Sequence, residues 1–215
     1  MKFENTETFN WEGAVRSARN PLNSWNHIDS HWNEDHSQYI LGPNDLSLLT
    51  RLVKAGSSHR KFARMIFVSV DITCPQYFAA ELDTYKINTV RNSCSFQHKG
   101  VSKMFELSDF TIEEGSDLNS WHDIIWELNR LRHLYLETKD YKYFRMIRQY
   151  LPSGYNYRFT YTCNYENLIT MCSKEQRRNH RLKEWSEDFI GWARSLPYAQ
   201  ELIFFDESES EVPNV

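Results

Sequence analysis

The sequence predicts an α+β fold in which helices pack on a small central sheet. Two short segments, 65–72 and 155–164, alternate between two faces, as half-buried strands do. Around them lie longer segments whose apolar residues recur every three or four positions, which is the helical period. A chain with few strands among several helices favours an α+β or an α/β protein.

Composition and length indicate an ordinary globular protein. The 215 residues are 40% hydrophobic and 25% charged, with only 7 Gly and 6 Pro, which excludes the collagen-like, disordered and coiled-coil classes. Apolar runs such as 65–70 are far shorter than the roughly 18–20 residues of a membrane span, and the N-terminus has no signal-peptide core. We therefore expect a cytoplasmic protein with reduced cysteines and no membrane contact.

The negative charge is concentrated at the C-terminus. Four acidic residues, Asp206, Glu207, Glu209 and Glu211, account for the whole formal net charge of −4. The rest of the chain is balanced, which argues against binding to duplex nucleic acid. A local basic pocket for a small anionic ligand remains compatible with this balance.

The expected elements divide the chain into three parts. Residues 1–44 show no clear period and are expected to form a loop-rich or helical extension. Residues 45–200 form the main domain, and the acidic residues 201–215 form a disordered tail. Helices are expected at 43–54 with Asp45 as N-cap, at 75–86, at 121–151 as two helices or one bent helix, and at 182–196; strands are expected at 65–72 and 155–164.

Two local groups admit both a chemical and an ordinary interpretation. On a helix, His27 and His31 would share a face and offer nitrogen ligands to zinc or manganese, although a solvated polar loop explains them equally. Cys94 and His98 form a possible nucleophile and base, but nothing in their spacing requires that role.

Arginines on two adjoining elements are more informative. Arg145 and Arg148 lie near the end of the helix before Pro152, and Arg158 and Asn164 share one face of the following strand. A solvated polar face is the ordinary interpretation. Guanidinium groups that converge from two elements also match a phosphate bidentately, as a nucleoside monophosphate site requires.

The segment IRQYLPSGYNYRFTYTCN, residues 147–164, resembles a motif of the flavin-dependent thymidylate synthases. That motif reads Ala-Arg-x-x-Leu-Pro, then an Arg, then an aromatic strand that ends in Thr-x-Asn. Downstream, RRNHRLKEW resembles the family's Arg-x-x-x-His, and upstream GSSHRKF resembles its Gly-His-x-Ser-Pro-Phe. The resemblance covers roughly residues 45–196 and implies the family's fold in a single domain.

The resemblance also implies roles for individual residues. Substrate contacts fall to Glu81, Lys86, Asn92, Cys94, Ser95, Arg148, Arg158, Arg177 and Arg178, and cofactor contacts to Arg64, Thr84, Tyr85, Lys86, Asn164 and His180. In the family, the first Arg of the motif contacts the nucleotide phosphate and the Asn contacts the flavin.

The family's signature, Gln-x-x-Arg-His-Arg-x-x-Ser, is degenerate in this chain. Glu81 replaces its Gln, and Thr84, Tyr85 and Lys86 replace Arg-His-Arg. Thr and Lys do not reproduce bidentate arginine contacts, so FAD binding is in doubt.

Two functions follow from this resemblance. One is reductive methylation of dUMP, with FAD, NADPH and methylene-tetrahydrofolate, by a homotetrameric methyltransferase of pyrimidine metabolism. The other is an inactive relative, a pseudoenzyme that binds, sequesters or senses a nucleotide without flavin chemistry.

Overall fold

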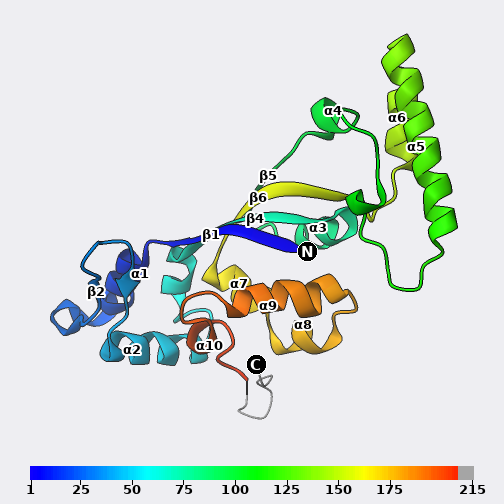
Figure 1. Ribbon diagram of the computed structural model, residues 1–215. Helices are drawn as coiled ribbons and strands as arrows, with labels where there is room; N and C mark the ends of the chain where they lie inside the picture. The colour runs from blue at the N-terminus through cyan, green and yellow to red at the C-terminus, as the bar shows by residue number, and fades with distance from the viewer. Residues whose placement is uncertain (208–215) are drawn as a thin grey trace. The chain divides into compact units, whose positions relative to one another are not determined.

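The computed structural model describes residues 1–207, except for the side chain of His98. Its main sheet has four strands in the order β1 (Lys2–Phe9), β4 (Phe67–Pro75), β6 (Asn156–Asn164) and β5 (Val90–Ser93) (Figure 1). The chain divides into two compact units, and each of these strands contributes residues to both. The predicted architecture of helices on a small sheet is confirmed.

The first unit comprises residues 1–2, 72–84 and 92–160. It contains α3 (Gln76–Leu82), α4 (Phe96–Lys99), the 3-10 turn η4 (Leu107–Asp109), α5 (Leu118–Thr138) and α6 (Tyr141–Tyr150). Figure 1 shows α5 and α6 side by side. Their apolar stripes enclose a cluster of buried side chains that includes Ile125, Leu128, Leu131 and Ile147. The predicted stripes therefore face this local core.

The segment expected as two helices or one bent helix is two helices. Lys139 adopts a left-handed conformation, with φ 57°, and ends α5. Asp140 then caps α6 by accepting a hydrogen bond from the backbone N–H of Lys142 at 2.9 Å. The left-handed residue Lys139 and the N-cap Asp140 therefore divide the predicted segment into two helices.

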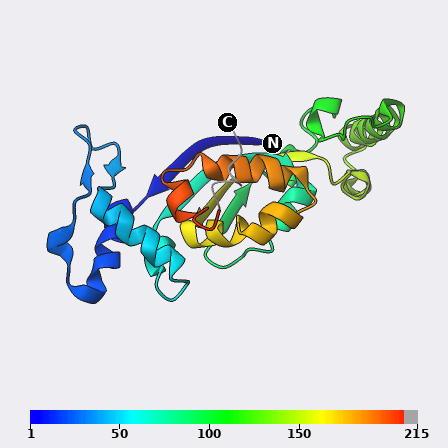
Figure 2. The same cartoon turned by 90° about the horizontal axis from the view of Figure 1, so that it is seen from below.

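The second unit comprises residues 3–71, 85–91 and 161–215. Its helices are α1 (Trp11–Arg19), α2 (Pro43–Lys54), α7 (Tyr165–Met171), α8 (Lys174–Asn179), α9 (Ile190–Arg194) and α10 (Ala199–Leu202); its shorter elements are η1 (Asn20–Leu22), η2 (Trp25–His27), β2 (His31–Trp32), β3 (Tyr39–Ile40), η3 (Lys61–Met65) and the π-helical η5 (Glu184–Phe189). Figures 1 and 2 both place α9 along β1, where the Phe3 and Trp192 rings stack at 5.1 Å.

Alternation in the two central strands is confirmed. Val68, Val70 and Ile72 of β4 are fully buried, as are Phe159 and Cys163 of β6. The structure describes no helix with the length and apolar character that crossing a bilayer demands.

Two expectations about the ends of the chain differ from the structure. The expected N-terminal extension begins with β1, a strand of the main sheet. The expected disordered tail is folded over residues 201–207, where Leu202, Ile203 and Phe204 are buried; its remainder, 208–215, lies outside the described residues. Burial of three consecutive apolar side chains explains why this segment is packed.

Asp45 joins three segments of the N-terminal region and is not the N-cap of α2, which is Gly42. Its carboxylate accepts hydrogen bonds from Arg19 Nε and Nη2 at 2.8 and 2.6 Å. It also accepts from the backbone N–H groups of Asp29 and Ser30 and from the Ser30 hydroxyl. Both charged side chains are almost completely buried, so the stability of this ion pair depends on the hydrogen bonds that satisfy both groups.

Replacing Asp45 by Asn should lower the free energy of unfolding by about 3–5 kcal/mol, because the Arg19 charge would stay buried without its counter-ion. Urea denaturation followed by circular dichroism measures this change. Glu127→Gln is the control, since it breaks the more exposed Arg130–Glu127 pair, and its effect should be far smaller. Equal effects of the two variants would contradict this account of Asp45.

Candidate functional site

The first unit brings two predicted arginines to one segment. Cys94 N–H donates to the Arg158 carbonyl at 2.9 Å, which fixes the end of β5 beside β6. Two residues later, the ring of Phe96 lies 5.7 Å from Arg148 Cζ. Residues 94–96 therefore contact both Arg148 on α6 and Arg158 on β6. We call Cys94, Ser95, Phe96, Arg148 and Arg158 the arginine-pair site.

Aromatic packing holds Phe96 in place within this site. Its ring meets Tyr155 nearly edge-on at 5.7 Å and Phe144 at 6.1 Å. The side chains of Arg148, Arg158, Cys94 and Ser95 are exposed. The site thus combines exposed polar and cationic residues with the ring of Phe96, and arginines of this kind can bind an anionic group.

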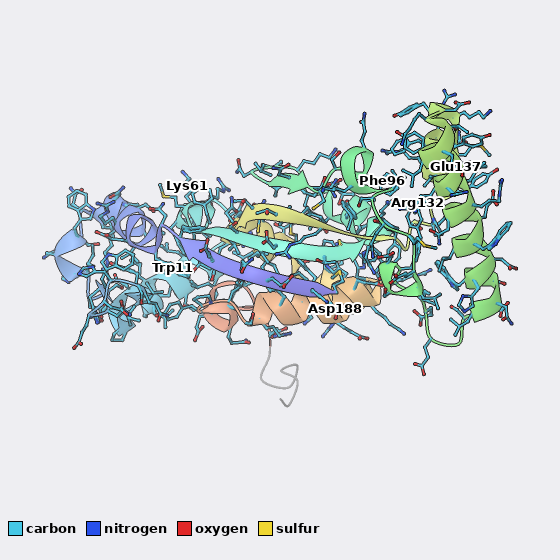
Figure 3. All side chains as sticks on the ribbon, turned by 45° about the horizontal axis from the view of Figure 1, so that its top comes forward. Trp11, Lys61, Phe96, Arg132, Glu137 and Asp188 are labelled. Carbon is cyan, nitrogen blue, oxygen red and sulfur yellow. The ribbon has the colours of Figure 1, made fainter. Side chains whose placement is uncertain are left out.

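The segment that follows α4 is anchored to α5. The Asn129 side chain exchanges two hydrogen bonds with the backbone of Phe105, at 2.8 and 2.9 Å. Arg132 donates from Nε to the Val101 carbonyl at 2.9 Å, and Figure 3 labels this residue on α5 together with Phe96 on α4. These contacts fix the far end of the segment that begins at Cys94.

A hollow of about 230 Å³ lies along the anchored segment. Its lining includes Lys99, Lys103 and Tyr155. Lys103 Nζ is 2.5 Å from the Asp109 carboxylate, so its charge is largely compensated. Burial raises the pKa of the Tyr155 phenol, and the Asp109 charge adds to that rise, so Tyr155 is a neutral hydrogen-bonding group at pH 7.

Three further predicted residues belong to the first unit. Glu81 is partly buried, and its carbonyl accepts a hydrogen bond from the Thr84 hydroxyl at 2.8 Å. Thr84 and Asn92 are exposed. None of these observations assigns them a ligand.

The other predicted residues lie in the second unit, where two of them contact the same indole. Trp185 is fully buried and donates from Nε1 to the Met171 carbonyl at 3.1 Å. His180 stacks on it at 4.7 Å, with an interplanar angle of 9°, and Tyr85 stacks at 5.4 Å and 30°. This contact gives Tyr85 a packing role at the position that the resemblance aligns with the His of Arg-His-Arg.

Arg177 and Asn164 also have internal partners. Arg177 donates to the Cys172 carbonyl at 2.6 Å and pairs with Asp206 and Glu207, each at 3.0 Å. Asn164 is 1% exposed, and its side-chain oxygen caps α7 by accepting from Asn167 N–H at 3.0 Å. Asn164 is thus buried at the end of β6, whereas Arg158, which the strand period assigns to the same face, is exposed.

Arg64, Lys86 and Arg178 are exposed. Arg64 Nη2 lies 3.4 Å from the Ser57 carbonyl. Of the positions aligned with Arg-His-Arg, therefore, only Lys86 supplies an exposed positive charge in this chain.

The alternative groups from the sequence receive no support. Among the described residues, no three His, Cys, Asp or Glu side chains gather to hold a metal ion. The proposed partner of Cys94, the side chain of His98, lies outside the described residues.

The pairing of Arg177 and Arg194 with the C-terminal carboxylates was missed by sequence reasoning. Glu207 accepts from Arg194 Nη1 and Nη2 at 2.8 and 2.6 Å, and its side chain is 1% exposed. The available signal was the apolar run 202–205 before the acidic residues, which predicts a segment that packs.

Comparison with known proteins identifies similar folds. Thymidylate synthase X (ThyX) from Helicobacter pylori with FAD and dUMP has a TM-score of 0.73 and 16% identity, over 96% of this chain and 98% of that chain. A second structure of the H. pylori enzyme, a flavin-dependent thymidylate synthase complexed with FAD and dUMP, has a TM-score of 0.72 and 15% identity, over 96% and 99%.

A third similar structure is the UMP/dUMP methylase PolB from Streptomyces cacaoi bound with 5-Br UMP. Its TM-score is 0.60 at 14% identity, over 95% of this chain and 94% of that chain. No family model matches the sequence, and no curated protein matches it either. At these identities the likeness shows the fold alone, and the predicted thymidylate-synthase-like fold is confirmed.

The arginine-pair site predicts a single reactive thiol. Cys94 is exposed, whereas Cys74, Cys163 and Cys172 are buried, and burial raises the pKa of the Cys163 and Cys172 thiols. A raised pKa keeps a thiol protonated and unreactive. Ellman's reagent at pH 8 should therefore modify one cysteine in the folded protein and four in guanidinium chloride. The Cys94→Ser variant should lose the rapid reaction of the folded protein, which identifies Cys94 as the reactive thiol. Rapid reaction of a second thiol would contradict the burial.

Proposed function

We propose that this chain binds a pyrimidine mononucleotide of the dUMP type, with Arg148 and Arg158 on its phosphate. One observation carries the proposal: residues 94–96 contact both arginines, by the Cys94–Arg158 backbone hydrogen bond and the Phe96–Arg148 contact. Arg148 and Arg158 lie on elements that meet this segment, and both side chains are exposed, so we assign their guanidinium groups as the donors to the phosphate.

The remaining groups of the site match the other parts of such a ligand. The Ser95 hydroxyl and the Asn92 amide are exposed beside the arginines and offer donors and acceptors for ribose or base edges. Phe96 and Tyr155 supply aromatic surface for packing. The three similar structures are complexes with dUMP or 5-Br UMP, which supports a pyrimidine nucleotide by fold analogy.

The residues do not fit FAD in the manner of the resembled family. Its pyrophosphate would face Thr84, Tyr85 and Lys86, where Thr84 bonds to Glu81 and Tyr85 packs on Trp185. Asn164, the expected flavin contact, is buried as a helix cap. We therefore propose nucleotide binding without flavin chemistry as the primary function.

Flavin-dependent methylation is the second candidate, favoured by the FAD in the two similar thymidylate synthase structures. It would also need NADPH and methylene-tetrahydrofolate. The homotetramer implied by the resemblance and the cytoplasmic location expected from the sequence stay predictions, which light scattering and cell fractionation can check.

Replacing Arg148 by Ala should weaken dUMP binding about tenfold or more, because one charged hydrogen bond contributes about 1.5–3 kcal/mol. Isothermal titration calorimetry with dUMP, dTMP and dCMP measures the change and ranks the bases. Arg130→Ala is the matched control, since it removes an arginine of the same unit whose partner is Glu127. Equal affinities of wild type and Arg148→Ala would remove the phosphate assignment.

Purified protein should carry no bound flavin, and saturating FAD should not change its affinity for dUMP. Restoring charge with Tyr85→His and Thr84→Arg should not suffice for tight FAD binding, because the introduced imidazole would still face the Trp185 ring and Asn164 would stay buried. Visible absorption after gel filtration measures the bound flavin. A yellow protein that rescues a thymidine auxotroph would overturn the primary function and establish the second candidate.

A further inference from the structure

The second unit contains a large groove whose lining carries the opposite charge to the arginine-pair site. It has a volume of about 600 Å³ and is lined by β1, the start of α1 and the β2–β3 hairpin, with Pro197. Four of its lining residues carry aromatic rings other than imidazole: Phe9, Trp11, Trp32 and Tyr39. None of the described residues that line it is Lys or Arg. Its walls are therefore aromatic and lack the groups that bind phosphate.

Two aromatic residues form a fixed base and two form an exposed rim. Trp11 and Tyr39 are each 6% exposed, whereas Trp32 and Phe9 are 41% and 44% exposed. Trp11 donates from Nε1 to the Thr8 hydroxyl at 2.9 Å, and Figure 3 labels it beside β1. Tyr39 meets the Trp32 indole nearly edge-on at 5.3 Å. The His36 imidazole lies 6.1 Å from the Trp32 ring at an interplanar angle of 31°, so Trp32 has two ring neighbours and is still exposed.

Carboxylates make this groove electronegative. Glu7 is among its lining residues, and Glu12 accepts a hydrogen bond from Trp32 Nε1 at 3.2 Å. The opposing charges nearby are Arg16 on α1 and, when protonated, His36 in the lining. Burial raises the pKa of the Tyr39 phenol, and the charges of Glu12 and Asp45 raise it further than Arg16 lowers it. Glu12 is thus the leading charge that acts on Tyr39, since the Asp45 carboxylate is paired with Arg19.

We propose that this groove binds a small organic cation with an alkylated ammonium group, placed over the Trp32 indole. Aromatic faces attract such cations through the ring quadrupole, and Trp gives the strongest contact. Glu7 and Glu12 add charge complementarity, and the methyl groups of the cation remove apolar surface of Phe9 and Trp32 from water. The inference is independent of the nucleotide site, because every lining residue belongs to the second unit.

Choline and its uncharged isostere 3,3-dimethylbutan-1-ol are the probes that test this proposal. Titration of the ¹⁵N-labelled full chain at about pH 8, where free imidazole is neutral, follows the indole N–H signals by NMR. Choline should shift the Trp32 signal in a saturable manner, and the isostere should bind at least about fivefold more weakly. Equal binding of the two would show an apolar groove only and would overturn the proposal.

Two variants and a matched control locate the effect. Trp32→Ala should weaken choline binding about fivefold or more, measured by the shift of the Trp11 indole signal. Glu12→Gln keeps an acceptor for Trp32 and removes one charge, so it should weaken choline but not the isostere. Trp25→Ala is the control: Trp25 is also half exposed, and its Nε1 bonds to Asn20, but it is not in the lining. Unchanged choline affinity in Trp32→Ala, or an equal loss in Trp25→Ala, would refute the site.

Discussion

The backbone hydrogen bond from Cys94 to the Arg158 carbonyl determines where the arginine-pair site can form. It fixes the beginning of a segment whose other end is held by Asn129 on α5. Phe96 lies between these two anchors and reaches Arg148. If the bond were absent, β5 would lose its continuation along β6, and Arg148 and Arg158 would no longer share a neighbouring segment. The site thus depends on sheet pairing at Arg158 together with the last turn of α6, which carries Arg148.

The arginines of this chain differ in what neutralises them. Arg19 and Arg60 pair with Asp45 and Glu166, and Arg194 is matched bidentately by Glu207. Their donors are already used, so binding an external anion would first cost those internal contacts. Arg148 instead lies against the ring of Phe96 and is exposed. A guanidinium over an aromatic face keeps its charge and its donors, which the phosphate contact that we propose requires.

Sequence reasoning succeeded where a local period decides the structure. The alternation of β4 and β6 and the stripes of α5 and α6 follow from burial of one face. It failed where contacts between residues far apart in the sequence determine the structure. The segment KFENTETF of β1 shows no strand period and is mostly exposed, so its place in the sheet comes from pairing with β4. The sequence predicts a solvated Glu207, yet in the structure its carboxylate pairs with Arg194 and Arg177 and its side chain is buried. In the candidate site, the sequence singled out Arg148 and Arg158 but gave no signal for Phe96, whose contact with Arg148 depends on the folded chain.

Tyr85 shows how a motif position can serve internal packing. The resemblance aligns it with the His of Arg-His-Arg, and in the structure its ring packs on the buried Trp185 beside His180. Aromatic contacts of this kind contribute about 0.5–1.5 kcal/mol beyond their buried area, so this position stabilises the fold. The signature positions and the arginine-pair site involve different residues, so nucleotide binding, as we propose it, does not require the flavin contacts of the resembled family.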